Sequence, residues 1–295
     1  MLNLRNNVKG KVLNKVVLIT GCSSGIGMEL AKTFIKKGYI TYGLARREIT
    51  LFGLRYIQGD VTKFDDCKAV IKKIIEEQGH IDILINNAGM GISGPIEYAG
   101  EEEVKKIIDV NFFGAWHMIK AALPFMREKN DGTIANISSF ASFTPIPFQA
   151  FYSASKAALD SLSVALRSEV KGFNIKVATI HPGDVKTGFT GAREKNTLKA
   201  GDPYAKICNN AVSQMEKDEQ SGMNASYAAK VIFKVATKDN PRLKTIVGNK
   251  YKFFNFALNL LPMRLKEWAV RAMYFGGKEK QDVEIIEPDT NLKDE

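Results

Sequence analysis

The segment that most constrains the fold is "VVLITGCSSGIGMELAKTF", residues 16–34, in which a short apolar strand leads into a glycine-rich turn and then a helix. A turn of this kind brings free backbone N–H groups and the positive end of a helix dipole together, which suits a pyrophosphate. Gly21 permits the turn, Gly25 leaves room beside the phosphates, and Gly27 lets the helix approach the strand closely. The segment therefore predicts a dinucleotide site at this junction.

Strand and helix patterns continue to alternate along the chain. Further strands are predicted over 39–45, 54–60, 81–89, 132–139 and 175–183, and further helices over 64–79, 101–129 and 151–172. This alternation predicts an α/β fold: a single doubly wound parallel-sheet Rossmann domain with helices on both faces and a C-terminal helical extension. Between Ala45 and Asp60 there is little room for a full helix, so a short crossover is expected there.

Composition excludes several classes of protein. The chain has 295 residues, a net charge of +10 and three cysteines. No basic stripe interleaved with aromatic residues appears, which argues against nucleic-acid binding. Cys22, Cys67 and Cys208 lack metal-ligand or disulfide-framework spacing, which predicts reduced thiols, no metal and a cytoplasmic protein. No apolar run approaches the roughly 18 residues of a membrane span, although membrane association stays possible.

Several motifs appear in a fixed order: the G-x-x-x-G-x-G loop, "NNAG" (86–89), Asn111, Ser139 with "YSASK" (152–156), and "PGDVKT" (182–187). Together they resemble the motifs of the short-chain dehydrogenase/reductase family, in particular its steroid- and retinol-type NADP-dependent members. The similarity covers roughly residues 14–190. It implies an enzyme of the carbonyl reductase or alcohol dehydrogenase type, which transfers hydride between a nicotinamide cofactor and a small-molecule carbonyl or alcohol, and a homodimer or homotetramer.

The predicted catalytic group centres on Tyr152 and Lys156, one helical turn apart. The spacing alone is common on solvated helices, but a nearby ammonium favours the phenolate and would lower the phenol pKa from about 10. The resemblance implies that Tyr152 exchanges the proton, Ser139 hydrogen-bonds the substrate oxygen, and Lys156 also holds the nicotinamide ribose. It makes Asn111 the support of a proton-relay water; the alternative is that this polar residue satisfies a local helix irregularity. Ser138 is the rival of Ser139, and the family spacing favours Ser139.

Charge after the second strand predicts the cofactor. A carboxylate there would select NAD, whereas this chain has Arg46 and Arg47, which can grip a 2′-phosphate, and Ser24 can add a hydroxyl donor. The sequence therefore favours NADP(H) over NAD(H). Beside the two arginines, the predicted cofactor-binding residues are Gly21, Ser23, Ser24, Gly25, Ile26, Gly27, Asp60, Val61, Asn87, Ala88, Gly89, Tyr152, Lys156, Pro182, Gly183, Val185 and Thr187. His181 is predicted to be a structural histidine.

Four regions are expected: an N-terminal arm (1–14), the Rossmann-type domain (15–250) with a polar substrate lid (188–223), cap or surface helices (251–277), and an acidic, flexible tail (278–295). Four phenylalanines and two prolines in 140–151 indicate either an apolar substrate, such as a steroid, retinoid or other lipid, or ordinary loop packing. Residues 251–276 suit a pocket cap or a subunit contact better than a peripheral membrane contact. The alternative function is a non-catalytic dinucleotide sensor or partner-binding protein, which would be expected to lose Tyr152 or Lys156.

Overall fold

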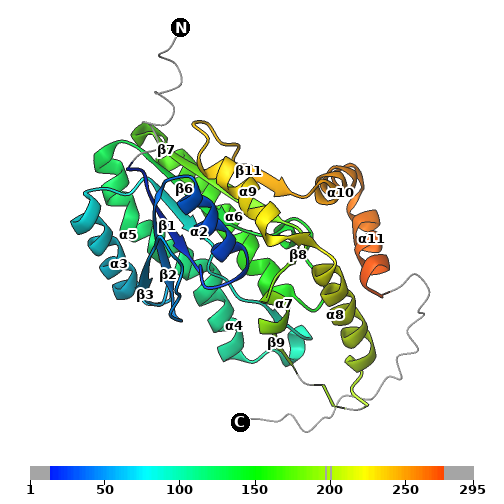
Figure 1. Cartoon of the computed structure of the whole chain (residues 1–295). Coiled ribbons are helices and arrows are strands. Elements are labelled where there is room, and N and C mark those ends of the chain that lie inside the picture. The colour runs from blue at the N-terminus through cyan, green and yellow to red at the C-terminus, as the bar shows by residue number, and fades with distance from the viewer. Residues whose placement is uncertain (1–13, 197, 200, 276–295) are drawn as a thin grey trace.

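A parallel sheet forms the centre of the molecule (Figure 1). The computed structural model describes residues 14–275 except 197 and 200, so the predicted tail and nearly all of the predicted arm lie outside the described residues. The sheet has seven strands in the order β11-β7-β6-β4-β1-β2-β3. Their bounds are β1 Val16–Thr20, β2 Ile40–Ala45, β3 Leu54–Gln58, β4 Ile83–Asn86, β6 Gly132–Ile137, β7 Ile175–Pro182 and β11 Lys244–Val247. The predicted doubly wound α/β fold is confirmed.

Helices cover both faces of this sheet, and the core is split accordingly. The helices α3 (Phe64–Gln78), α5 (Gly114–Lys129) and α6 (Ala150–Glu169) cover one face, and α2 (Gly25–Lys36) and α9 (Ala225–Ala236) cover the other. Alternate residues of a strand point to opposite faces. In β1, Val16 and Leu18 therefore join one buried cluster, and Val17 and Ile19 join the other. A strand buried on both sides needs an unbroken apolar run, as the sequence has here.

Two of the predicted segments show how local detail follows from the sequence. Residues 46–53 form no helix, so the expected short crossover between β2 and β3 is confirmed. The single long helix expected over 101–129 is wrong, because the chain forms α4 (Glu101–Ile108), a π-helical turn (Asp109–Phe113) and then α5. The π turn carries Asn111, whose side chain bonds the main chain of Met90 instead of solvent. Such turns commonly occur at functional sites.

The polar region after β7 is more regular than its composition suggested. It contains β8 (Val185–Lys186), α7 (Phe189–Ala192), β9 (Glu194–Lys195), α8 (Ala205–Gln220) and β10 (Met223–Asn224). The short strand β5 (Ile92–Ser93) pairs in parallel with β9 and ties this region to the loop after β4, and β10 pairs in parallel with β8 within the region. The helices α10 (Asn249–Leu260) and α11 (Met263–Phe275) follow β11, and α11 packs against α8 (Figure 1). Single 3₁₀ turns occur at Ile96–Tyr98, Phe140–Ser142 and Lys171–Phe173.

Candidate active site

A cavity of about 1030 Å³ lies at the carboxyl ends of the central strands. It extends from the glycine loop and Arg46 at one end to α10 and α11 at the other. The two neighbours of β1 are β2 and β4, so the strand order reverses beside the glycine loop, which is where ligands bind in open α/β sheets. All of the predicted site residues line this cavity except Gly27 and Asn111.

The glycine loop forms a cradle in which the turn positions 21 and 25 carry no side chain. Gly21 and Gly25 have φ values of +65° and +53°, which side-chain-bearing residues rarely adopt. Ser24 is the N-cap of α2 but makes no side-chain cap bond, so the first N–H groups of the helix have no hydroxyl cap. A Cβ at Gly27 would lie 2.3 Å from the Gly21 carbonyl oxygen, so Gly27 allows the predicted close packing from behind the cavity. This cradle fits an anionic pyrophosphate.

The end of the cavity beside β2 and β3 is bordered by exposed positive charge. Arg46 and Arg47 follow β2, line the cavity and are exposed, and Gln58 fixes the backbone by donating to the Arg46 carbonyl oxygen at 3.1 Å. Asp60, after β3, accepts hydrogen bonds from the backbone N and the hydroxyl of Thr62, at 3.0 and 2.9 Å. The Asp60 carboxylate therefore stabilises its own turn. The charged groups that can bind a ligand here are the guanidinium groups of Arg46 and Arg47.

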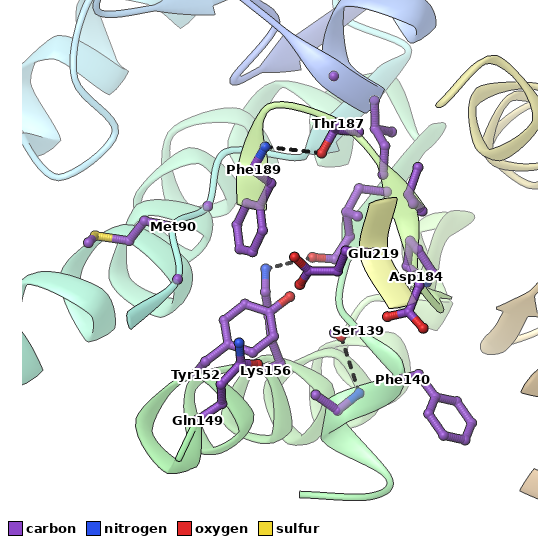
Figure 2. Close-up of a pocket in the computed structure, with 18 of the residues that line it drawn as sticks. Met90, Ser139, Phe140, Gln149, Tyr152, Lys156, Asp184, Thr187, Phe189 and Glu219 are labelled. Atoms are coloured by element: carbon purple, nitrogen blue, oxygen red, sulfur yellow. Dashed lines mark hydrogen bonds between the residues drawn. The ribbon is translucent and has the colours of Figure 1, made fainter. Parts of the chain in front are cut away.

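The sheet and α6 bring Ser139, Tyr152 and Lys156 together (Figure 2). Ser139 follows β6, and its Oγ accepts a hydrogen bond from the N–H of Ala141 at 3.2 Å, which holds the hydroxyl at the start of a 3₁₀ turn. The Lys156 Nζ is buried, donates to the carbonyl oxygen of Ile137 at 3.0 Å, and lies 5.9 Å from the centroid of the Tyr152 ring. The three side chains thus converge on one wall of the cavity.

The electrostatics of this group differ from the simplest expectation. Burial raises the pKa of Tyr152, and the strongest influence that lowers it is a hydrogen bond from Ser139, with a weaker contribution from Arg193. Burial also lowers the pKa of Lys156 to about 8, although the Asp160 carboxylate raises it. The net pKa of Tyr152 is therefore raised, and the strongest influence that lowers it comes from Ser139, whereas the sequence pointed to Lys156.

Asn111 is fully engaged in hydrogen bonds outside the cavity. Its Oδ1 accepts from the N–H of Met90 at 2.8 Å, and its Nδ2 donates to the Met90 carbonyl oxygen and to Ser155 Oγ, both at 3.0 Å. These bonds fit the second interpretation of this residue, in which it satisfies the irregular turn. They also tie the helix to the loop after β4, beside Gly89, where a Cβ would lie 3.2 Å from Asn111 Oδ1.

The lid region supplies side chains that the sequence did not single out. The Phe189 ring lies 5.8 Å from the Tyr152 ring, and Asp184 and Glu219 also line the cavity (Figure 2). Glu219 pairs with Arg193, whose side chain is fully buried. Asp184 belongs to the "PGDVKT" motif, but no motif marks Phe189 or Glu219. Their placement depends on how α7 and α8 pack, which a polar pattern does not predict.

Two aromatic segments were expected near the cavity mouth, and they differ in outcome. Of the four phenylalanines in 140–151, only Phe140 lines the cavity, and Phe143 packs instead on the ring of His181 at 4.4 Å. The C-terminal helices contribute more. Residues of both helices line the cavity: Lys250, Tyr251, Phe254 and Leu258 from α10, and Trp268, Ala269, Val270, Ala272, Met273 and Tyr274 from α11.

Comparisons with known proteins agree with this geometry. The family model for short chain dehydrogenase matches residues 15–198. A 3-ketodihydrosphingosine reductase of Bacteroides thetaiotaomicron is 40% identical over 263 residues, covering 88% of this chain and 98% of the relative. An NADPH-dependent 1-acyldihydroxyacetone phosphate reductase of Schizosaccharomyces pombe is 40% identical, covering 59% and 60% of the two chains. A solved short-chain dehydrogenase from Streptomyces avermitilis superposes with a TM-score of 0.75 at 30% identity, covering 86% and 96%.

Proposed function

Because the chain belongs to the short-chain dehydrogenase/reductase family of oxidoreductases, we propose that it uses NADP(H) to interconvert an apolar, lipid-like carbonyl compound and its alcohol. The observation that carries the proposal is the convergence of Ser139, Tyr152 and Lys156 in the cavity that begins at the glycine cradle. A sensor or partner-binding protein of the same fold would need none of these three side chains in this arrangement.

The proposed chemistry divides between cofactor and protein. A bound nicotinamide dinucleotide supplies the hydride in reduction, or accepts it in oxidation. Tyr152 is protonated at neutral pH, as any phenol with an ordinary or raised pKa is, so it can donate that proton to the carbonyl oxygen in the direction of reduction. Ser139 donates a hydrogen bond to the same oxygen as negative charge develops there. The Lys156 ammonium stabilises the tyrosinate that remains.

The preference for NADP(H) rests on the charge at the end of β2. Arg46 and Arg47 line the cavity where a carboxylate would bind the ribose hydroxyl of NAD. A guanidinium offers bidentate, charge-assisted bonds to a 2′-phosphate, whereas a carboxylate would repel it. The similarity to a relative named as NADPH-dependent supports the same choice.

The lipid-like substrate is supported by the far end of the cavity. Phe140, Phe254 and Leu258 present apolar surface there, while polar groups gather beside Tyr152. This division suits a molecule with a polar reacting end and an apolar body. The two relatives described above are named for 3-ketodihydrosphingosine and for 1-acyldihydroxyacetone phosphate, and both names support the same class.

A panel of ketones assayed with NADPH and with NADH tests the proposal. We expect oxidation of NADPH with long-chain ketones and little turnover of short polar sugars. Tyr152→Phe should reduce kcat by at least about 100-fold, because the general acid is removed. NADPH binding, measured by fluorescence, should survive in this variant and serves as the control for folding. Equal turnover by Tyr152→Phe would show that Tyr152 is not the general acid, whereas NADPH binding without turnover of any ketone by the wild type would favour the non-catalytic alternative.

A further inference from the structure

The helix α10 has two apolar faces. Tyr251, Phe254 and Leu258, three and four residues apart, line the cavity. A second set, Phe253, Phe256 and Leu260, has the same spacing but is 69%, 64% and 69% exposed. A helix that only covers a cavity needs one apolar face, and its outer face is normally polar. The second face therefore requires another explanation.

The exposed apolar surface continues onto α11. Met263 is 75% exposed, and Leu265 is about half exposed, immediately after the turn that joins the two helices. We call the set Phe253, Phe256, Leu260, Met263 and Leu265 the outer apolar surface; none of its members lines the cavity. Contiguous apolar patches of this kind mark interaction sites, whereas single exposed apolar residues need no explanation.

Charge identifies the kind of partner. The two helices carry the basic residues Lys250, Lys252, Arg264, Lys266 and Arg271, and Glu267 is their one acidic residue. Aromatic and aliphatic side chains combined with basic ones are typical of helices that lie in the surface of an anionic bilayer. A two-fold contact between copies of this chain would place these like charges against each other, which disfavours self-association. Among the described residues, no helix is long and apolar enough to cross a bilayer.

The cavity wall that α11 forms reaches the surface of the molecule. Trp268 and Met273 line the cavity, yet they are 68% and 48% exposed, and Trp268 lies one helical turn after Leu265 of the outer apolar surface. In Figure 1, α10 and α11 stand together at the β11 edge of the molecule. We propose that the outer apolar surface docks on an anionic lipid membrane, so that the cavity opens toward the bilayer. The entry of substrate from the bilayer rests on the lipid-like substrate proposed above, whereas the docking of the outer apolar surface does not depend on it.

Co-sedimentation of the full chain with vesicles tests the docking. We expect the protein to pellet with vesicles of phosphatidylcholine and phosphatidylglycerol in about equal parts, and to stay in the supernatant with phosphatidylcholine alone. The triple variant Phe253→Ser/Phe256→Ser/Leu260→Ser should bind more than tenfold more weakly, because apolar burial is lost. Phe52→Ser is the matched control: Phe52 is 97% exposed and precedes β3, at the opposite edge of the sheet.

The charge contribution is measured separately. Lys252→Gln, Arg264→Gln and Arg271→Gln should each weaken binding about fivefold, and added salt should weaken the wild type. Lys36→Gln, at the end of α2, should not change binding. The proposal is overturned if the triple serine variant binds vesicles as well as the wild type, or if the wild type binds neither kind of vesicle. The proposal is also overturned if the wild type forms a concentration-dependent dimer, seen by chromatography, and the triple variant alone loses it. Turnover of a soluble ketone by the triple variant should be unchanged, which keeps a failure of docking distinct from a failure of the proposed function.

Discussion

Asp160 lies one helical turn after Lys156 on α6, and its carboxylate raises the pKa of the lysine amine. Burial raises the pKa of Asp160 itself, but hydrogen bonds from His181, Ser138 and Ser142 bring it below its ordinary value, so the carboxylate stays ionised. His181 Nε2 donates to Asp160 Oδ2 at 2.8 Å and is fully buried outside the cavity. The position of His181 agrees with its predicted structural role, and Asp160 lies between it and the lysine.

Asp160→Asn should move the alkaline limb of the pH profile to lower pH. The Lys156 pKa of about 8 predicts that kcat/KM for reduction is constant below that pH and falls above it, as the ammonium loses its proton. Removing the neighbouring negative charge disfavours the ammonium, so its pKa drops and the fall begins earlier. At pH 8 the variant should be about two- to tenfold slower than the wild type.

The control for this profile is Asp131→Asn, because Asp131 is paired with Lys176 at 2.6 Å and does not line the cavity. It should leave the alkaline limb in place. If kcat/KM of Asp160→Asn began to fall at the same pH as that of the wild type, another group would control the fall in rate.

The central sheet and the glycine cradle could be predicted from sequence because both depend on local patterns. The apolar run Val16–Thr20 and the glycines at 21 and 25 determine strand, turn and helix within about twenty residues. Ser139 and Tyr152 could be brought together only through the family resemblance, since the spacing of two residues does not say which strand end a helix meets.

The substrate end could not be predicted in the same way. Glu219 belongs to α8, whose polar pattern gave no sign that one carboxylate would face Tyr152. Likewise, the side chain of Asn111 bonds a main chain twenty-one residues away, and only that long-range bond explains why the expected single helix is broken. Both depend on tertiary packing, which a local pattern does not encode.

Gly89→Ala should impair catalysis more than folding. The added Cβ would lie 3.2 Å from Asn111 Oδ1 and 3.3 Å from Lys156 Nζ, so one of the two side chains must shift. Displacing the amine from the Tyr152 ring should reduce kcat/KM by about 10- to 100-fold, and the free energy of unfolding should fall by about 1 to 2 kcal/mol. Gly172→Ala is the control, since its Cβ would meet nothing within 4 Å. Wild-type activity in Gly89→Ala would contradict this account of the lysine.

Arg46→Asp should reverse the cofactor preference. The carboxylate would repel a 2′-phosphate and accept a bond from a ribose hydroxyl instead. We expect the ratio of kcat/KM for NADPH over NADH to fall by about 100-fold, mostly through a higher KM for NADPH. Arg242→Asp makes the same charge change on an exposed residue before β11 and should leave the ratio unchanged. An unaltered ratio in Arg46→Asp would remove the basis for NADP(H).

Glu219→Leu should destabilise the fold strongly, because it leaves the Arg193 guanidinium buried without its counter-charge. Arg193 has a fully buried side chain, and besides Glu219 its one hydrogen-bond partner in the described part of the chain is the Gln149 amide oxygen, at 2.9 Å, in the orientation that the hydrogen bonds require. Breaking such a pair from one side costs about 3 to 5 kcal/mol, whereas replacing both partners by apolar residues costs far less. Urea unfolding of Glu219→Leu and of Arg193→Met/Glu219→Leu should show this difference.

The same pair of variants separates stability from catalysis. Glu219 raises the pKa of Tyr152 and Arg193 lowers it, so the double variant should change that pKa less than either single one. Glu101→Leu, which breaks the exposed pair with Lys105, should alter the free energy of unfolding by no more than about 0.5 kcal/mol. If Glu219→Leu were as stable as the wild type, the buried Arg193 guanidinium would have to reach water or another partner. Glu219 would then not be needed to neutralise Arg193, and its carboxylate could act on the ligand alone.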